Sequence, residues 1–392
     1  MESGFRGGRF PRPKRGLVHI ASINWDWWWA RQQQLTERLS RDWKTIFVEQ
    51  MLSIDGAILR ARLFHRYGPN LWILSPFKLL PFESKLPFLY AINRYFFAVL
   101  VRLAMIATGI ENPILLFSTY DSHGLLSRIS HALVVYDCLD LHESFPWATG
   151  VEPALERELI RQADVVIASA PQLVSKLVRE GVAAVLIRNA ADVRFFQKAR
   201  ESGPIHPKIE RLPPPRIGFV GYVADHVDLD LLDYVACERP GWSLLLVGRR
   251  SVRDHVLFSR PNVTYVGEIP YAEIPAVLRG LDVCLIPFKK GPLTDAADTI
   301  KLYEYLSAGK QVVSTGISQA REFVQFIGVA DTPEDFLHEI EARLSASSSI
   351  DTLSLDRILS ESDWDARTRV LEGVMEEALA RKEVRSNYSS PP

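Results

Sequence analysis

The chain has 392 residues, of which 47% are apolar and 24% are charged, and its formal net charge is -1. This length favours two domains, the composition is that of a folded soluble protein, and the balanced charge excludes an overall field that attracts nucleic acid. Three cysteines, Cys138, Cys237 and Cys284, stand far apart. Their spacing argues against a disulfide framework or a zinc site and suits a reducing compartment.

Residues 1–15 are basic, and we expect a disordered, solvated leader there. They hold a single acid against these cations: Arg6, Arg9, Arg12, Lys14 and Arg15. The alternative is an arm that contacts anionic lipid or nucleic acid, although we expect no nucleic-acid partner. No secretory signal follows, and the most apolar stretch, 95–110, is short and interrupted by Arg102. We therefore expect a cytoplasmic protein, with peripheral attachment to the inner face of the plasma membrane left open.

Short apolar runs alternate with longer amphipathic stretches in the first half, as in α/β proteins with parallel sheets. The expected strands are 16–23, 45–49, 71–75, 114–118, 133–136, 165–168 and 184–187. The expected helices are 31–40, 87–108, 152–161 and 171–180. These elements define an N-terminal, acceptor-side domain over residues 16–203.

Five prolines within residues 204–215 predict an extended linker between domains. After the linker, RIGFVG, SLLLVG and NVTYVG each predict a strand that ends in glycine. Strand, glycine and helix in succession bring backbone close to a ligand at the carboxyl end of a sheet. The expected fold is two Rossmann-like, doubly wound α/β domains facing across a cleft. The second domain spans 216–364, a helix at 365–381 packs back on the first, and 382–392 form a disordered tail.

The segment TIKLYEYLSAGKQVV carries the strongest functional signal. A buried strand leads into a loop and then a helix, whose first N–H groups, at Thr299 and Ile300, suit a diphosphate. Thr299 or Asp298 could cap this helix, Lys301 adds a cation, and Glu304 can reach sugar hydroxyls. The alternative is a surface helix with a solvated Lys–Glu pair.

This string resembles the donor-binding helix of family 4 glycosyltransferases, which have the GT-B fold and retain anomeric configuration. Other stretches resemble the same family: IRNAADVRFF, RIGFVGYVAD, NVTYVGEIPYAEIPAVLRGLDVCLIPF and SDWDARTRVLEGVM. The resemblance implies that Glu304 holds the ribose of a UDP-, GDP- or dTDP-sugar. It also implies a hexosyltransferase that needs neither a metal nor another cofactor.

A narrower resemblance comes from ASINWDWWWARQQQL and VVYDCLDLHESFP, which are similar to bacterial envelope-polysaccharide glycosyltransferases of the teichuronic acid synthesis type. It implies a saccharide or lipid-linked acceptor and a role in cell-envelope polysaccharide synthesis. The tryptophan-rich segment follows the first strand and faces the expected cleft. We expect Asn24, Trp25, Asp26 and Trp27 to bind the acceptor, because aromatic faces stack on sugar rings. The alternative is that the tryptophans pack the first helix against the sheet.

The sequence departs from the family pattern on the donor side. A second Glu expected eight positions before Glu304 is replaced by Ala296, and Asp295 or Asp298 could substitute for it. The cations expected after the first donor-domain strand are also missing. The phosphate charge must then be met by Lys301, by helix N–H groups or by Arg249, with Lys289 and Lys290 as further candidates. The predicted donor-binding residues also include the strand-end positions Gly221, Tyr222 and Gly248. These departures indicate either an altered substrate or a non-catalytic protein that keeps the fold as a binding or scaffold module.

Acids and a histidine follow two strands of the N-terminal domain. In the family, a His–Asp pair near this strand end faces the donor sugar, and the resemblance carries this role to Asp137 and Asp140. His123 follows another strand end and is a further catalytic candidate, although a buried or solvated histidine is the alternative. We expect no protein nucleophile and no metal, so catalysis comes from orientation and from stabilising the departing diphosphate.

Residues 58–107 interleave cations with large apolar side chains. Such a mixture suits contact with an anionic bilayer, where a lipid-linked acceptor is presented. The alternative is a set of ordinary core helices with snorkelling cations. A nicotinamide-dependent oxidoreductase is disfavoured, because no strand leads into a G-x-G-x-x-G turn.

Overall fold

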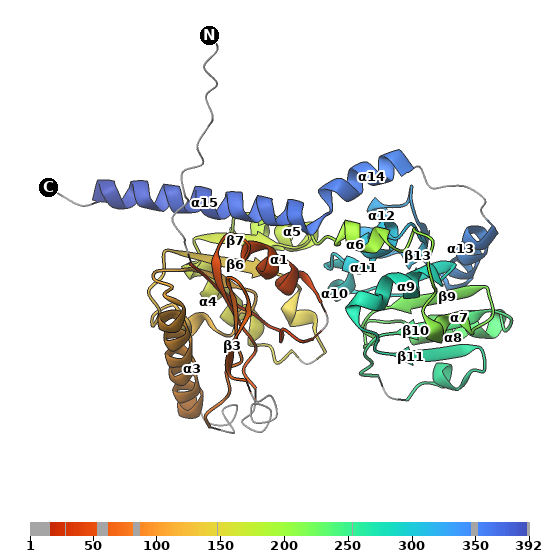
Figure 1. Cartoon of the computed structure of the whole chain (residues 1–392), viewed down its shortest axis with the longest axis horizontal. Coiled ribbons are helices and arrows are strands. Elements are labelled where there is room, and N and C mark those ends of the chain that lie inside the picture. The colour runs from red at the N-terminus through yellow and green to blue at the C-terminus, as the bar shows by residue number, and fades with distance from the viewer. Residues whose placement is uncertain are drawn as a thin grey trace, which may run out of the picture.

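The computed structural model describes residues 16–27, 29–52, 62–80, 87–146, 148–252, 254–345 and 352–389. It confirms the α/β class, with two sheets in two domains and helices against both faces of each (Figure 1). The predicted leader, residues 1–15, and Trp28 of the tryptophan-rich segment lie outside the described residues.

The N-terminal sheet has eight strands in the order β3-β4-β2-β1-β5-β6-β7-β8. Their bounds are β1 (Gly16–Ile20), β2 (Lys44–Val48), β3 (Phe64–Gly68), β4 (Leu71–Leu74), β5 (Ile114–Phe117), β6 (Leu133–Cys138), β7 (Val165–Ala168) and β8 (Ala184–Leu186). All pairs are parallel except β3 with β4, which is antiparallel. The sequence analysis missed β3, because this half-exposed edge strand, FHRYG, has no apolar run.

Helices cover both faces of this sheet because successive side chains of a strand point to opposite faces. On β1, Leu17 packs toward one helical layer and Val18 toward the other. The helical segments of this domain are α1 (Arg31–Leu39), α3 (Pro87–Thr108), η1 (His123–Leu125), η2 (His142–Ser144), α4 (Glu152–Gln162) and α5 (Pro171–Arg179). The next helix, α6 (Val193–Gln197), already belongs to the C-terminal domain, because Phe196 is part of the core of that domain. The predicted helices agree with α1, α3, α4 and α5 to within a residue at each end.

The C-terminal sheet is parallel throughout, in the order β11-β10-β9-β12-β13-β14. Its strands are β9 (Arg216–Val220), β10 (Ser243–Val247), β11 (Val263–Gly267), β12 (Val283–Ile286), β13 (Gln311–Thr315) and β14 (Gly328–Ala330). The helical segments around it are α7 (Pro207–Glu210), α8 (Leu229–Glu238), η3 (Val256–Ser259), η4 (Tyr271–Glu273), α9 (Ile274–Arg279), α10 (Pro292–Asp295), α11 (Ile300–Ser307), α12 (Ser318–Glu322), α13 (Pro333–Ser345) and α14 (Thr352–Glu361).

The predicted linker is not extended throughout, because α7 forms inside it. Pro207 sits in the first turn of this helix, where its missing N–H costs nothing, and His206 caps it. Ile209 of α7 is fully buried in the core of the C-terminal domain. The proline-rich segment therefore packs within the C-terminal domain, and the predicted interdomain linker at 204–215 was wrong, because the chain passes between the domains earlier, near Ala191.

The last helix, α15 (Trp364–Ser389), returns from the C-terminal domain and lies along the N-terminal one (Figure 1). Trp364 and Leu371 are buried against the same core cluster as Leu17. The chain first passes from the N-terminal to the C-terminal domain near Ala191, and we call this segment the first crossover. Where α15 begins, it is bonded to that segment, because the Trp364 N–H donates to the carbonyl of Ala191 at 3.1 Å. The predicted disordered tail from residue 382 was wrong as far as Ser389, because the helix continues to that residue.

Candidate functional site

The carboxyl ends of β9 and β10 approach each other so closely that only glycine fits. Gly248 has a φ of +125°, and a Cβ there would lie 2.2 Å from the carbonyl oxygen of Gly221. Tyr305 of α11 fixes this edge, because its hydroxyl accepts from the Val220 N–H at 2.8 Å. Tyr222 lies half-buried just beyond Gly221. Predicted donor-binding residues from two strands and α11 therefore come together at one edge of the sheet.

Helix α11 begins without a side-chain cap at Thr299, whose own N–H is held by Gln319 Oε1 at 2.7 Å. The prediction that Thr299 or Asp298 caps the helix was wrong. The Asp298 carboxylate is engaged elsewhere, as described below, and the Thr299 side chain makes no cap hydrogen bond. Ile300, the first helical residue, packs against the core cluster of the N-terminal domain. The positive end of α11 thus meets the opposite domain.

Glu304 is 3% exposed, one turn further along the same helix. Lys301 Nζ donates to its Oε2 at 2.7 Å. Burial raises the pKa of Glu304, and the Lys301 ammonium opposes that rise. The Glu304 charge in turn helps to raise the pKa of Tyr271. A buried carboxylate with one neighbouring cation is a strong acceptor of hydrogen bonds from hydroxyl groups.

Asp298 joins the two domains. Its carboxylate accepts from the backbone N–H of Asn189 at 2.7 Å, from the Tyr303 hydroxyl at 2.9 Å and from Gln319 Nε2 at 2.7 Å. Arg188 Nη1 lies 3.7 Å from it. Burial raises the pKa of Asp298 to about 6 despite these partners. The structure therefore gives Asp298 bonds to the first crossover rather than an open face toward a sugar.

The other donor-side acids and Ala296 are placed differently from one another. Ala296, which stands where the family has a Glu, is buried and packs against the core cluster of the N-terminal domain. Asp295 is half-buried and accepts from the backbone N–H of Ser318 at 3.3 Å, at the start of α12. Neither position brings a second carboxylate beside Glu304.

Arg249 is the predicted cation at the end of β10, and it reaches across the cleft. It is exposed, and its guanidinium lies 5.7 Å from the centre of the Trp27 ring. A guanidinium over an indole face is attracted by the quadrupole of the ring. The acceptor-side prediction for Trp27 and the donor-side prediction for Arg249 thus meet in one contact between the domains.

Trp25 does not offer its face to a ligand. It is 2% exposed, and its ring packs edge-on against Phe47 at 4.9 Å and Trp29 at 5.2 Å. The prediction that it stacks on an acceptor sugar was wrong, because the segment turns it into the core below β2. Asn24 is also buried, whereas Asp26 is exposed. Of the four predicted acceptor residues, Asp26 and Trp27 keep accessible surface.

Arg31, a buried cation at the start of α1, was not predicted from the sequence. Its Nε and Nη2 donate to the two oxygens of Asp137 at 2.9 and 3.0 Å, and its Nη1 donates to the carbonyl of Ile187 at 2.8 Å. Both Arg31 and Asp137 are buried. Asp137 therefore holds an ion pair, not an open position in the cleft. The available signal was an Arg at the first position of the helix that follows the tryptophan-rich segment.

Asp140 and His123 lie on the loops that follow β6 and β5. Burial raises the pKa of Asp140, Asp137 adds to the rise, and His142 opposes it. His123 is half-buried, with Nδ1 3.3 Å from the carbonyl oxygen of Tyr120. The Tyr120 ring meets the ring of His142 edge-on at 4.8 Å, so the two loops touch. No group of three or more potential metal ligands occurs among the residues that the structure describes.

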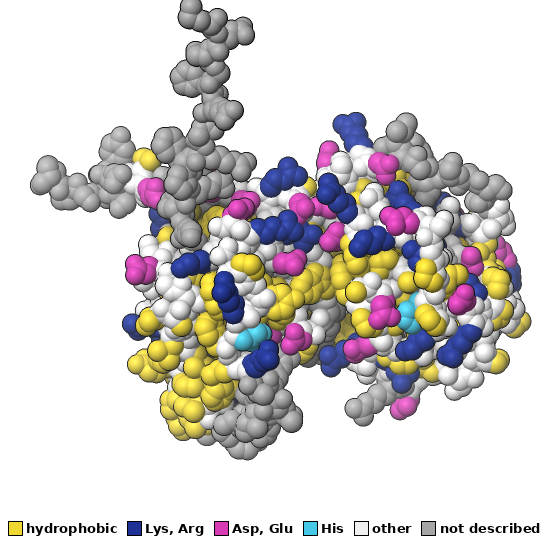
Figure 2. Space-filling model, viewed as in Figure 1, with side chains coloured by type: hydrophobic (Ala, Val, Ile, Leu, Met, Phe, Trp, Pro, Cys, Tyr) yellow, Lys and Arg dark blue, Asp and Glu magenta, His cyan; other side chains and the backbone are white. Residues whose placement is uncertain are grey.

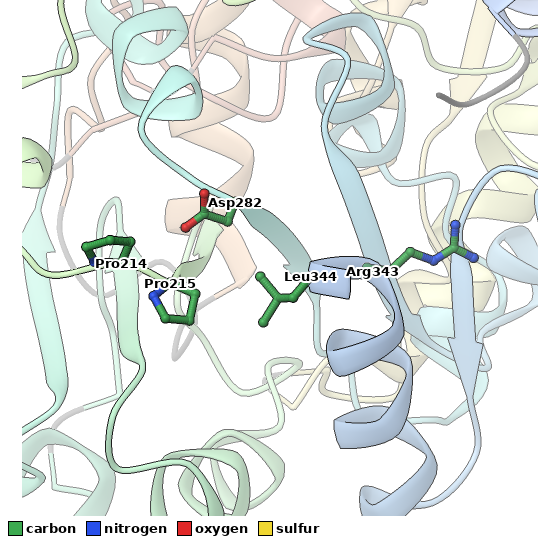
Figure 3. A pocket seen from close by; sticks show the side chains of 5 residues that line it. All are labelled: Pro214, Pro215, Asp282, Arg343 and Leu344. Atoms are coloured by element: carbon green, nitrogen blue, oxygen red, sulfur yellow. The ribbon is translucent and has the colours of Figure 1, made fainter. Parts of the chain in front are cut away.

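A depression of about 570 Å³ lies on the far side of the C-terminal domain (Figure 3). Pro214, Pro215 and Asp282 line it at the amino ends of β9 and β12, and Arg343 and Leu344 come from α13. Ligands of open α/β sheets bind at the carboxyl ends of the strands. This depression is therefore separate from the site.

The comparisons with known proteins agree with this geometry. Residues 214–345 match the family described as Glycosyl transferases group 1, and that span contains all the donor-side residues named above. The chain thus contains a domain that matches the glycosyl transferases group 1 family, within a two-domain α/β fold of the GT-B type.

Among its relatives is a Bacillus subtilis (strain 168) protein, TuaH, provisionally named a teichuronic acid biosynthesis glycosyltransferase. The two are 26% identical over 282 residues, which cover 65% of this chain and 70% of the relative. Among solved structures, sucrose-phosphate synthase from Thermosynechococcus elongatus matches with a TM-score of 0.72 at 16% identity, over 94% of this chain and 100% of that one. Anabaena Alr3699/HepE in complex with UDP and glucose matches with a TM-score of 0.63 at 13% identity, over 92% and 99%. These structural matches confirm the fold.

Proposed function

We propose that the protein is a retaining glycosyltransferase that moves a hexose from a nucleotide-diphosphate sugar to a saccharide or lipid-linked acceptor in cell-envelope polysaccharide synthesis. The observation that carries the proposal is Glu304, a buried carboxylate on a helix whose first turn faces the opposite domain. The relative named for teichuronic acid biosynthesis supports a role in the synthesis of an envelope polysaccharide. The Anabaena complex with UDP and glucose supports a nucleotide-diphosphate sugar as the donor.

In this proposal the ribose hydroxyls donate to Glu304, and the diphosphate lies at the first turn of α11. Lys301 is close to the same position, and Arg249 can leave Trp27 to approach the phosphates. These cations and the helix N-terminus would stabilise the charge that develops on the departing diphosphate. We propose that no metal takes part, so turnover should persist in excess EDTA.

The donor proposal is tested by titrating the protein with UDP, GDP and dTDP in a calorimeter. We expect one nucleotide to saturate, and Glu304→Gln to weaken its binding about tenfold, because the amide offers one neutral acceptor oxygen where the carboxylate offers two charged ones. Glu334→Gln, at an exposed position of α13, is the matched control and should bind as the wild type does. Equal affinities for Glu304→Gln and wild type would contradict the proposal.

A second candidate is a non-catalytic GT-B protein that binds nucleotide sugars. It is favoured by Ala296, which buries a methyl group where the family has a hexose-binding Glu. Acceptor-dependent release of nucleoside diphosphate would exclude it. The anomeric configuration of the new linkage in the glycosylated acceptor, read by NMR, would test retention.

We also propose that the protein works in the cytoplasm in peripheral contact with the inner face of the plasma membrane, where a lipid-linked acceptor would be found. The interleaved cations and apolar residues of the N-terminal domain support this location. Fractionation of cells that express a tagged chain would test it, because a salt-sensitive membrane fraction is expected.

A further inference from the structure

Helix α3 has a buried face and an exposed apolar face. Phe97, Val101 and Met105 pack into the core of the N-terminal domain. On the outer side, large apolar side chains are 41–75% exposed: Phe88, Ile92, Tyr95, Leu103 and Ile106. At 100° per residue these positions fall within one side of the helix. Figure 2 shows hydrophobic side chains gathered over the end of the molecule that α3 occupies in Figure 1.

The charge of this face is one-sided. From Pro87 to Ile110 the sequence contains two arginines, Arg94 and Arg102, and no acid. Arg102 is exposed beside Leu103, whereas Arg94 is mostly buried and contacts Asp121 at 3.5 Å. An apolar stripe that carries a cation and no carboxylate is complementary to a bilayer with anionic headgroups. A second copy of the chain would bring a second Arg102, and no carboxylate of this helix, to the same face.

The helix is long and apolar enough to cross a membrane by length and composition. In the folded chain its inner side is part of the core, so crossing would expose Phe97 and its neighbours and break that core. An orientation along the bilayer surface keeps the core intact and buries only the exposed stripe.

We propose that the outer face of α3 docks on the surface of an anionic lipid bilayer, with Leu103 and Ile106 inserted among the headgroups. This proposal names the surface that would make the membrane contact proposed above, and it rests on the proposed function only for the reason that such contact would be useful. The first half of α3 is also tied to the loop that carries His123. The Tyr90 hydroxyl donates to the carbonyl of Asp121 at 3.1 Å, and Arg94 donates to Ser122 Oγ at 3.3 Å. Docking would therefore bring this edge of the cleft toward the lipid.

Flotation of the full chain with vesicles of phosphatidylcholine, with and without phosphatidylglycerol, tests the proposal. We expect binding to both, about fivefold stronger to the anionic vesicles, because each cation near such a surface contributes about 1 kcal/mol. Leu103→Ser/Ile106→Ser should lower the partition coefficient at least tenfold. The matched control, Val256→Ser/Val324→Ser, removes two side chains of the C-terminal domain that are 54% and 58% exposed, and should bind as wild type.

Far-UV circular dichroism and an unchanged denaturation midpoint check that the double variant is folded. Nucleotide titration separates this proposal from the donor proposal, since the donor site lies in the other domain. Wild-type affinity for nucleotide with reduced vesicle binding supports docking. Vesicle binding that is absent in wild type, or equal in wild type and the double variant, overturns it. Light scattering that shows a dimer lost in Leu103→Ser/Ile106→Ser also overturns it and assigns the face to a second copy.

Discussion

The carboxyl edges of the two sheets, which face each other, are built from different kinds of structure. The donor edge of the C-terminal sheet is formed by closely apposed backbone at Gly221 and Gly248, a helix without a side-chain cap and the buried carboxylate of Glu304. The acceptor edge of the N-terminal sheet is filled by interlocked side chains, with Trp25 in the core and Arg31 paired to Asp137. The difference implies that donor-edge changes alter ligand affinity, whereas acceptor-edge changes alter stability first. The following substitutions test this division.

The largest effect is expected at Arg31. Arg31→Met leaves the Asp137 carboxylate buried without its partner, and this should lower the free energy of unfolding by about 3–5 kcal/mol. Urea denaturation followed by far-UV circular dichroism measures the loss. Arg31→Met/Asp137→Leu is the control, because removing both charges should restore most of the stability. An unchanged denaturation midpoint in Arg31→Met would show that the acceptor edge does not depend on this pair.

The next effect is a pH dependence that originates at His19 on β1. Burial lowers the pKa of His19 to about 3, and its two ring nitrogens are hydrogen-bonded to the hydroxyl groups of Thr36 and Ser118. A histidine with a lowered folded pKa binds its proton in the unfolded state, so its contribution to stability is lost as the pH falls from about 6.5 toward 3. Between pH 7 and pH 5 the loss is about 2 kcal/mol.

The contribution of Asp298, on the donor edge, to stability changes with pH in the opposite direction. Its raised pKa, about 6, means that the folded state holds the proton more tightly, so its contribution to stability grows as the pH falls through 6 toward 4. The His19 contribution is therefore measured as a difference. His19→Gln should lose about 2 kcal/mol less than wild type between pH 7 and pH 5. Equal losses in wild type and His19→Gln would contradict a neutral, buried His19.

A smaller effect on affinity is expected at Glu304. Glu304→Gln should weaken nucleotide binding about tenfold, or about 1.4 kcal/mol, while the denaturation midpoint stays the same or rises. The midpoint is expected to hold because burial raises the pKa of this carboxyl, so the charged form is costly in the fold. A large fall in the midpoint would place Glu304 with the structural residues and break the division between the edges.

The smallest effect is expected where the edges meet. Arg249→Ala removes a cation–π contact with Trp27 that is worth about 0.5–1 kcal/mol at an exposed site. The free energy of nucleotide binding should weaken by more than the free energy of unfolding, because the variant has no cation at this position to approach the phosphates. Trp27→Ala is the companion variant, and it should keep wild-type nucleotide affinity. Equal losses of affinity in both variants would mean that the contact itself, rather than the cation, shapes the donor edge.

Much of the fold could be read from the sequence, because its signals are local. Buried parallel strands are continuous apolar runs, and the glycines after β9 and β10 mark where backbone approaches backbone. The edge strand β3 could not be read in this way, since its sequence, FHRYG, has neither an apolar run nor a polar–apolar alternation and no residue of it is fully buried. The length of α15 was also missed, because its last turns have no apolar periodicity.

The site was less predictable, because partners from distant segments decide what each side chain does. The position of Glu304 followed from a local motif. By contrast, Asp298 was taken as a donor or capping residue, and its carboxylate is used by Asn189, which lies in the first crossover. Trp25 was expected at the surface, and the space below β2 accepts its ring. Contacts between residues so far apart in the sequence produce no local pattern of residue spacing from which they could be predicted.

The way that α15 begins has a consequence for engineering. The chain crosses between the domains twice, near Ala191 and near Asp363, and the two crossings are paired by a β-bridge and neighbouring hydrogen bonds. A gene cut at the proline-rich segment would therefore separate Trp364 and Leu371 from the apolar surface that they cover. Each half must be made as a discontinuous unit, with the first 200 or so residues joined to the last helix. Domain exchange with a homologous enzyme should accordingly use two junctions, one at each crossing.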